Sequence, residues 1–108
     1  MSLNEKEIEA RKEVALKAIK AAFGSEEDEY GATLFIEHHL EEIEKEYWIK
    51  NFGTATPEPN QILDKLILKS HWNDDCIFDF TLPNDATDYV ISVQFDENGE
   101  VEDISMES

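Results

Sequence analysis

The sequence predicts an α+β domain in which two to three N-terminal helices pack on one face of a C-terminal antiparallel β-meander of three to four strands. Three observations support this fold class. Apolar residues recur at helical spacing in the first part of the chain, they alternate with polar residues in the last part, and short turn-forming stretches separate the alternating segments. Helices followed by closely spaced strands are typical of an antiparallel sheet covered on one side. At 108 residues, the chain has the length of a single domain over 1–108, and we expect residues 1–4 and 107–108 to be frayed.

A first helix is expected over residues 5–23. Asn4 followed by Glu7 forms a capping-box pattern, and Gly24 supplies a stop after the last apolar residue of the helix. A second helix is expected over residues 33–50, where one face is apolar and the opposite face is rich in glutamate. The apolar stripe consists of Ile36, Leu40, Ile43 and Tyr47.

Three apolar residues near the end of this second helix lie off its stripe, and they are Trp48, Ile49 and Phe52. Either this end of the helix is covered on more than one side, or it forms a contact surface, for example in a homodimer through Trp48 and Phe52. A domain of this size needs most of its large aromatic residues for its core. We therefore expect the core to take most of the group Tyr47, Trp48, Phe52 and Trp72.

A short third helix is expected over residues 57–65, because Thr56 can cap it and two prolines suit its first turn. Residues 66–72 then alternate at period two, with Leu66, Leu68, Ser70 and Trp72 predicted to share one face. This alternation favours a strand, although a continuation of the helix is also compatible with it.

Three further strands are expected over residues 76–82, 89–95 and 101–106. The turn formers at 73–75 precede the first of them, and Pro83 ends it before a turn at Asn84 and Asp85. The tetrapeptide Asp96–Gly99 between the last two strands is a strong hairpin signal, because asparagine and glycine tolerate positive φ.

The charge of the chain is strongly negative, with 26 acidic residues against 9 Lys and Arg and a formal net charge of −17. After Lys69 there is no Lys or Arg, whereas acidic residues continue to the end of the chain. Such a surface repels phosphate backbones and anionic lipid, so we expect neither a nucleic acid nor a membrane as partner. A basic protein surface is the favoured partner, and solubility alone is the simpler explanation of the charge.

The candidate partner-binding residues combine acids of the C-terminal part with two tryptophans. They are Asp74, Asp75, Asp79, Asp85, Asp88, Trp48 and Trp72. Tryptophan is over-represented at interface hot spots, and acidic side chains would pair with a basic partner. We expect a monomer or a homodimer.

The weak candidates for metal ligation are His38, His39, His71 and Cys76. His38 and His39 are adjacent, so a helix splays them apart and they cannot hold one ion from a single face. His71 and Cys76 flank a turn and can become cross-strand neighbours. Two acids directly precede Cys76 and disfavour its thiolate, so a core thiol is the preferred interpretation. No phosphate cradle or catalytic motif is visible, and we predict no catalytic residue, no cofactor and no enzymatic activity.

Several segments carry a resemblance to a family of small acidic bacterial proteins described as a domain of unknown function. The first is the stretch that begins with Phe35–Leu40 and ends with Tyr47-Trp48. The others are Pro59–Leu63, Asp79–Pro83, and the stretch that begins with Tyr89–Val93 and ends with Asn98-Gly99. The resemblance covers most of residues 30–106 and implies a bacterial α+β domain without an assigned reaction. Some families of this size and acidity are immunity proteins, and that association is an analogy. The resemblance carries no functional residues over to this chain.

The leading functional hypothesis is a non-enzymatic protein-binding module, immunity-like, antitoxin-like or regulatory, that engages a basic partner. The alternative is a metal-binding protein or metal-dependent enzyme that uses His38 or His39 together with His71 and Cys76. No apolar run reaches the length of a membrane span, and the N-terminus lacks the pattern of a secretory signal. We therefore expect a soluble, cytoplasmic protein.

Overall fold

The computed structural model describes residues 4–29, 31–72 and 76–107. Within them, four α-helices precede a four-stranded antiparallel sheet, which confirms the predicted fold class. The helices are α1 (Glu5–Ala22), α2 (Ala32–Glu42), α3 (Lys45–Phe52) and α4 (Pro59–Asp64). The strands are β1 (Ile67–Trp72), β2 (Ile77–Thr81), β3 (Val90–Phe95) and β4 (Val101–Glu107). Two short 3₁₀ turns, Glu26–Asp28 and Pro83–Asp85, connect α1 to α2 and β2 to β3.

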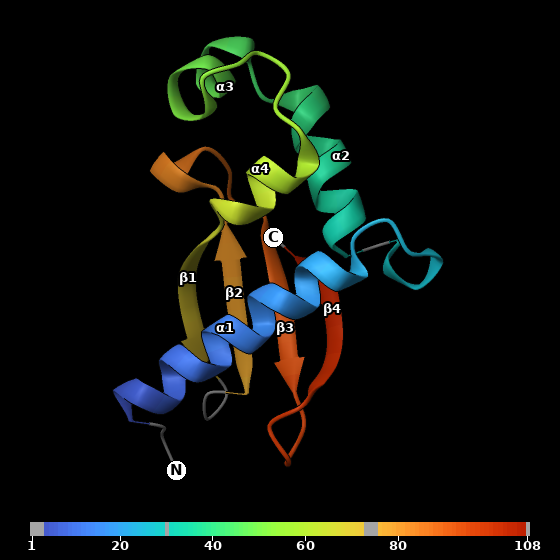
Figure 1. The fold of residues 1–108 in the computed structure, drawn as a ribbon, viewed down its shortest axis with the longest axis vertical. Helices are drawn as coiled ribbons and strands as arrows, with labels where there is room; N and C mark the ends of the chain where they lie inside the picture. Colours follow the sequence, from blue (N-terminus) through green and yellow to red (C-terminus); the bar gives the residue numbers. More distant parts are fainter. Residues whose placement is uncertain (1–3, 30, 73–75, 108) are drawn as a thin grey trace.

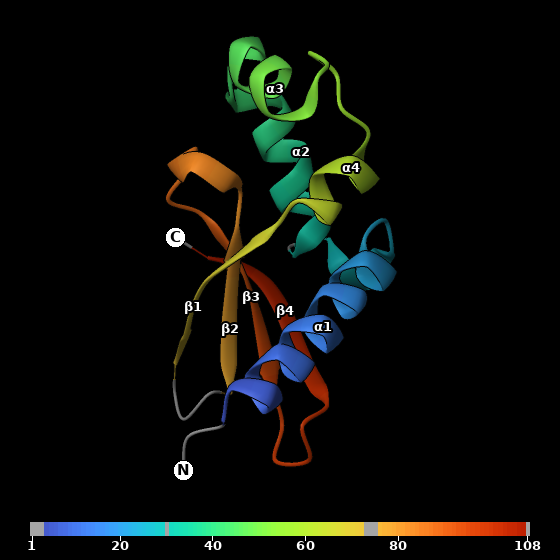
Figure 2. The same ribbon diagram turned by 60° about the vertical axis from the view of Figure 1, so that its left-hand side comes forward.

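The sheet is a simple meander in the order β1-β2-β3-β4. Helix α1 lies across one side of it, and the other helices continue toward and beyond one end of the strands, with α3 farthest from the sheet. In Figure 1, α1 crosses in front of the strands, and Figure 2 shows that the opposite side of the sheet carries no helix. The core lies between the two layers. It includes Ala15, Ile19, Phe35, Ile36, Ile62 and Leu63 from the helices and Phe78, Phe80, Ile91, Val93 and Phe95 from the strands. One face of the sheet is therefore buried, and the other is open.

Helix α1 begins and ends close to the predicted bounds. The side chain of Asn4 accepts a hydrogen bond from the backbone N–H of Glu7 at 2.9 Å, and Gly24 follows the helix with φ of 86°. Of the residues expected to be frayed, Asn4 caps α1 and Glu107 belongs to β4. Residues 1–3 and 108 lie outside the described residues. None of the helices among the described residues is long and apolar enough to cross a membrane.

The connection from α1 to α2 is organised by a buried carboxylate. Asp28 is 4% exposed, and it accepts hydrogen bonds from the backbone N–H groups of Ala32 and Thr33 at 3.1 and 2.8 Å. The hydroxyl of Thr33 donates a further bond to Asp28 and accepts one from the N–H of Gly24. Because these backbone groups have no partner within the first turn of α2, Asp28 fixes where that helix begins.

The second predicted helix, over residues 33–50, is wrong in one respect because the structure divides it into α2 and α3. Ile43 and Glu44 have extended backbone angles, with ψ of 138° and 148°. A continuous helix would place Trp48 off its apolar stripe, whereas the break directs α3 so that Trp48 is only 1% exposed and packs against Tyr47 and Phe52. The break thus exchanges a few helical hydrogen bonds for the burial of a large indole, whose Nε1–H has no hydrogen-bond partner among the described residues.

Helix α4 confirms the short helix expected over residues 57–65, but its cap differs from the prediction. Pro59 occupies the first turn, and Glu58 rather than Thr56 stands at the N-cap. The backbone N–H of Glu58 donates to the side chain of Gln61 at 2.8 Å, as in a capping box. The helix begins later than predicted because Pro59 favours the first helical position and the residue before a proline avoids helical angles.

Residues 67–72 form strand β1 and do not continue the helix, but the strand contains a bulge that changes which side chains share a face. Leu68 pairs with Phe80 on the core side, whereas the next registered pair is Ser70 with Asp79 on the open side, so Lys69 is the extra residue. Trp72 then pairs with Ile77. The prediction that Leu68, Ser70 and Trp72 share a face is therefore wrong beyond Lys69.

The other strands confirm the predicted segments with small shifts at their ends. Pro83 follows β2, and Asn84 adopts φ of 63° in the predicted turn. In the turn between β3 and β4, Gly99 has φ of 80°, and the Asp96 side chain accepts hydrogen bonds from two backbone N–H groups of the turn. The predicted turn at 73–75 lies outside the described residues.

Candidate functional site

The candidate site is the side of the sheet that no helix covers, and we call it the open face. Its side chains are Ser70 and Trp72 of β1, Ile77 and Asp79 of β2, Val90, Ser92 and Gln94 of β3, and Asp103, Ser105 and Glu107 of β4. Together with Lys69 and Asp88 they line a hollow of about 470 Å³. A twisted sheet without a helix on one side presents such a concave surface to solvent.

Asp79 lies at the centre of the open face, and side chains from both neighbouring strands hold it. Its Oδ2 accepts a hydrogen bond from the indole Nε1–H of Trp72 at 2.9 Å and a long one from the hydroxyl of Ser70 at 3.4 Å. Its Oδ1 accepts a hydrogen bond from the hydroxyl of Ser92. The carboxylate is therefore fixed in orientation on strand β2 while its surroundings remain accessible.

Trp72 is the most exposed large hydrophobic residue of the open face. It is 53% exposed and pairs across the strands with Ile77. Ile67, at the start of the same strand, is also an exposed large hydrophobic residue and pairs with Thr81 on the open side. Exposed aromatic residues beside polar groups are typical of surfaces that bind other molecules.

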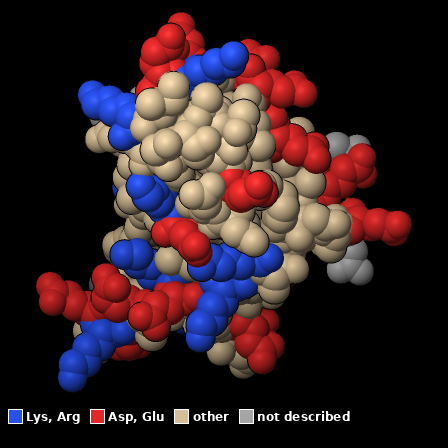
Figure 3. Space-filling view, turned by 45° about the horizontal axis from the view of Figure 1, so that its top comes forward, with Lys and Arg blue, Asp and Glu red and all other residues tan. Residues whose placement is uncertain are grey.

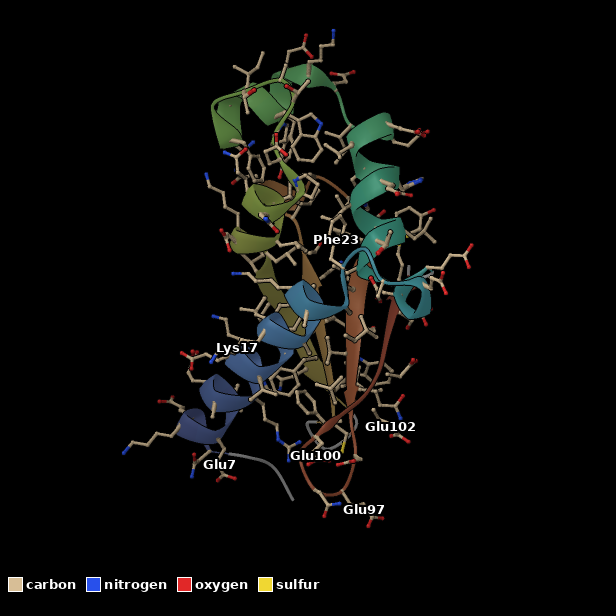
Figure 4. The ribbon with its side chains drawn as sticks, turned by 45° about the vertical axis from the view of Figure 1, so that its right-hand side comes forward. Glu7, Lys17, Phe23, Glu97, Glu100 and Glu102 are labelled. Atoms are coloured by element: carbon tan, nitrogen blue, oxygen red, sulfur yellow. The ribbon has the colours of Figure 1, made fainter. Side chains whose placement is uncertain are left out.

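The charge of the open face is negative. Of the described residues that line the hollow, four are acids and one is a base. The acids are Asp79, Asp88, Asp103 and Glu107, and the base is Lys69. Further carboxylates lie at the β3–β4 end of the sheet, where Figure 4 shows Glu97, Glu100 and Glu102. The guanidinium of Arg11 lies close to Gly99 in the same turn.

The basic residues of the N-terminal part lie on the other side of the sheet. Figure 3 shows Lys and Arg interspersed with Asp and Glu on the side that the helices cover, and Figure 4 shows Lys17 directed away from the acids of the β3–β4 turn. Lys20 of α1 forms an ion pair with Asp64 of α4, which is also on this side. Helix α1 packs through Ala15 and Ile19 on the covered face, so the sheet separates its bases from the open face.

The structure brings three of the predicted partner-binding residues together on or beside the open face, and they are Trp72, Asp79 and Asp88. Trp48 requires a correction, because its side chain is on the buried face of α3 and offers almost no surface to a partner. The backbone of Asp85 belongs to the turn after β2, but its side chain lies outside what the structure describes, as do Asp74 and Asp75.

Sequence reasoning missed the polar residues that complete the open face. They are Ser70, Ser92, Gln94 and Ser105. Ser92, Gln94 and Ser105 alternate with core-facing residues of their strands, so the period-two pattern could have placed these three on the outer face, whereas Ser70 reaches that face only through the bulge in β1. The contacts of Ser70 and Ser92 with the carboxylate of Asp79 depend on the strand register and on the bulge, which the pattern does not define.

Histidine 39 has a structural role. It is 2% exposed, and its Nδ1–H donates to the backbone oxygen of Phe35 at 2.6 Å while its Nε2 accepts from the hydroxyl of Thr87 at 2.9 Å. Burial lowers the pKa of His39 below 6.5, the hydrogen bond to Phe35 opposes this shift, and the nearby His38 lowers the pKa further. Both ring nitrogens are thus engaged within the fold.

The structure does not gather the four candidate metal ligands. His38 and His39 pack against Tyr89 at the start of β3, whereas His71 stacks on Phe78, which pairs further along β3. Cys76 is half-buried just before β2 and is not part of the core, contrary to expectation. Among the residues that the structure describes, no three His, Cys, Asp or Glu side chains are grouped so that they could hold a metal ion.

Comparisons of the chain with models of protein families, with curated proteins and with solved structures give no match. The function is therefore inferred from the chemistry of the open face.

Proposed function

We propose that the protein is a non-enzymatic binding module that engages a basic segment of a partner protein on the open face of its sheet. The observation that carries this proposal is the combination, in one hollow, of an exposed tryptophan, an oriented carboxylate and an excess of acids over bases. The apolar surface of Trp72 and Ile77 supplies contact area, and the carboxylates select the sign of the partner's charge.

The charge of the whole chain supports the same partner class. A net charge of −17 creates a long-range potential that accelerates association with a basic protein and slows association with an acidic one. Salt screens this attraction over about 10 Å at an ionic strength near 0.1 M. Binding to the open face should therefore weaken steeply as salt is added, mainly through a slower association rate.

An immunity-like, antitoxin-like or regulatory role is the biological setting that we propose for this module. Proteins of these kinds act by covering a surface of another protein, and a concave acidic face is suited to covering a basic surface. No group-transfer chemistry is required for such a role.

The proposal can be tested with a peptide of alternating arginine and lysine as the basic probe. Its binding would be followed by the backbone amide shifts of the ¹⁵N-labelled protein and by titration calorimetry at low and at physiological salt. We expect the largest shifts at Trp72, Asp79 and Ser92. Absence of binding at low salt, or shifts spread over all acidic segments, would overturn the proposal.

Two double variants separate a specific site from general attraction. Asp79→Asn with Asp103→Asn removes two charges from the open face, whereas Glu9→Gln with Glu13→Gln removes two from exposed positions of α1. Because both variants have the same net charge, the long-range attraction changes equally. The open-face variant should lose several-fold more affinity, and equal losses would show that the probe has no defined site.

A further inference from the structure

We propose that Trp72 and Asp79 form a subsite for the side chain of an arginine, rather than a lysine, in the partner. This inference rests on the proposed function and specifies the residue that the open face recognises. It follows from how the indole and the carboxylate are placed relative to each other and from the surface that each leaves available.

The indole of Trp72 is held by its edge. Its Nε1–H donates to Asp79 Oδ2 at 2.9 Å, and a hydrogen bond in the plane of the ring leaves the π faces uncovered by the carboxylate. Ile77 lies beside Trp72 on the neighbouring strand, yet Trp72 remains 53% exposed. The subsite therefore presents an accessible aromatic surface next to a fixed negative charge.

Asp79 retains capacity for a further donor. A carboxylate has about four acceptor positions, and the side chains of Trp72, Ser70 and Ser92 occupy at most three of them. Oδ1 accepts from Ser92 alone among the described contacts, so it is the oxygen with room for a donor from the partner. The existing hydrogen bonds orient the carboxylate before the partner arrives, which reduces the entropy lost on binding.

Arginine matches this arrangement better than lysine does. The guanidinium is planar and weakly hydrated, so it can stack on the indole while its N–H groups reach the carboxylate. The ammonium of lysine is a compact and strongly hydrated charge, and it can pair with the carboxylate without gaining from the ring. The preference should therefore depend on Trp72, whereas Asp79 should contribute to the binding of both residues.

The chain's own cations illustrate the contrast between the two sides of the sheet. Arg11 lies over the ring of Phe95 at 5.2 Å, and Lys65 lies over the ring of Phe52 at 5.0 Å. The first contact lies on the helix-covered side of the sheet, and the second joins the end of α3 to the residue that follows α4. Among the described residues, none of the cations lies over the ring of Trp72 in this way, so its aromatic surface is available to a partner.

The test compares oligo-arginine and oligo-lysine peptides of equal length by titration calorimetry with the full chain. Trp72 contributes one of two indole N–H signals in NMR spectra, and this signal should shift with oligo-arginine. We expect oligo-arginine to bind about two- to fivefold more tightly. In Trp72→Ala this preference should disappear, and in Trp72→Phe part of it should remain.

Ile49→Ala is the matched control, because Ile49 is an exposed apolar residue of α3 with 54% exposure, close to that of Trp72. This variant should keep the preference for arginine. Equal affinities of the two peptides in the parent protein, or an arginine preference that survives in Trp72→Ala, would overturn the inference while leaving the proposed function intact. If neither peptide binds to the open face, the inference and the proposed function both fail.

Discussion

Trp72 donates a hydrogen bond to Asp79 across two neighbouring strands, and the bulge at Lys69 makes this contact possible. If Lys69 were paired like its neighbours, regular alternation from Leu68 would turn Ser70 and Trp72 toward the core. The bulge instead places both side chains on the open face, where they meet the carboxylate of Asp79. Bulges near sheet edges often redirect a side chain in this way.

Deletion of Lys69 provides a direct test of this relationship. Because Lys69 is the unpaired residue, its removal should give a regular strand in which Ser70 and Trp72 keep their present faces. We expect the Trp72 indole N–H signal and the thermal midpoint to remain close to those of the parent. Deletion of His71 is the control, because it should turn Trp72 toward the core and lower the midpoint. Equal damage from the two deletions would contradict the assignment of Lys69 as the extra residue.

Gly31 is required by close packing at the start of α2. A Cβ at this position would collide with the carboxylate of Asp28 and would lie 2.9 Å from the backbone oxygen of Ile104 in β4. Gly31→Ala should therefore lower the free energy of unfolding by about 3 kcal/mol, the upper part of the usual range for overpacking. Denaturant unfolding would measure the change.

Gly24→Ala is the matched control for this substitution. Gly24 has φ of 86°, but a Cβ there would meet nothing within 4 Å. Only backbone strain should oppose alanine at this position, with a cost of about 1 kcal/mol. A smaller loss for Gly31→Ala than for Gly24→Ala would contradict the close approach of Asp28 and β4 to Gly31.

The sequence predicts the fold class and most element bounds because local signals decide them. The cap at Asn4, the alternation through Phe78 and Phe80, and the turn ending in Gly99 all act within a few residues. The break at Ile43 and Glu44 has no such signal, since no glycine or proline marks it. It results from the burial of Trp48, which is a tertiary effect that overrides the helical pattern.

The candidate site could be predicted only in part for a similar reason. Charge and residue type indicate Asp79 and Trp72 as members of a binding surface, and the structure places them in contact. The same criteria also selected Trp48, because the sequence does not distinguish a buried from an exposed indole near the end of a helix. Ser92 joins the site only through the pairing of β2 with β3, and that register is not encoded in local periodicity.

His39 should make the stability of the protein depend on pH. Burial holds its pKa in the folded state below the ordinary value of 6.5. As pH falls, the unfolded chain therefore binds a proton to this residue before the folded protein does. The contribution of neutral His39 to the free energy of unfolding is complete above about pH 6.5 and is lost as pH falls through the lowered pKa of the folded state. The free energy of unfolding should accordingly decrease below about pH 6.5, before most carboxylates titrate.

Comparison of two histidine variants tests this assignment. His39→Gln should abolish most of the decrease between about pH 6.5 and pH 5, even if it lowers stability overall. His71→Gln is the control, because it also removes one imidazole but leaves His39 in place, so the decrease assigned to His39 should remain. Denaturant unfolding at several pH values would measure both slopes. An unchanged slope in His39→Gln would show that another group is responsible.

Trp48 and Trp72 should respond differently to a quencher because they are 1% and 53% exposed. Acrylamide is neutral, so the negative charge of the protein does not repel it, and it should quench the emission of Trp72 while leaving that of Trp48 largely intact. In Trp72→Phe the remaining emission should be nearly resistant. Trp48→Phe, with its fold verified by circular dichroism, should be quenched almost completely. Strong quenching of Trp72→Phe would contradict the burial of Trp48 on the inner face of α3 and would restore this residue as a candidate for partner binding.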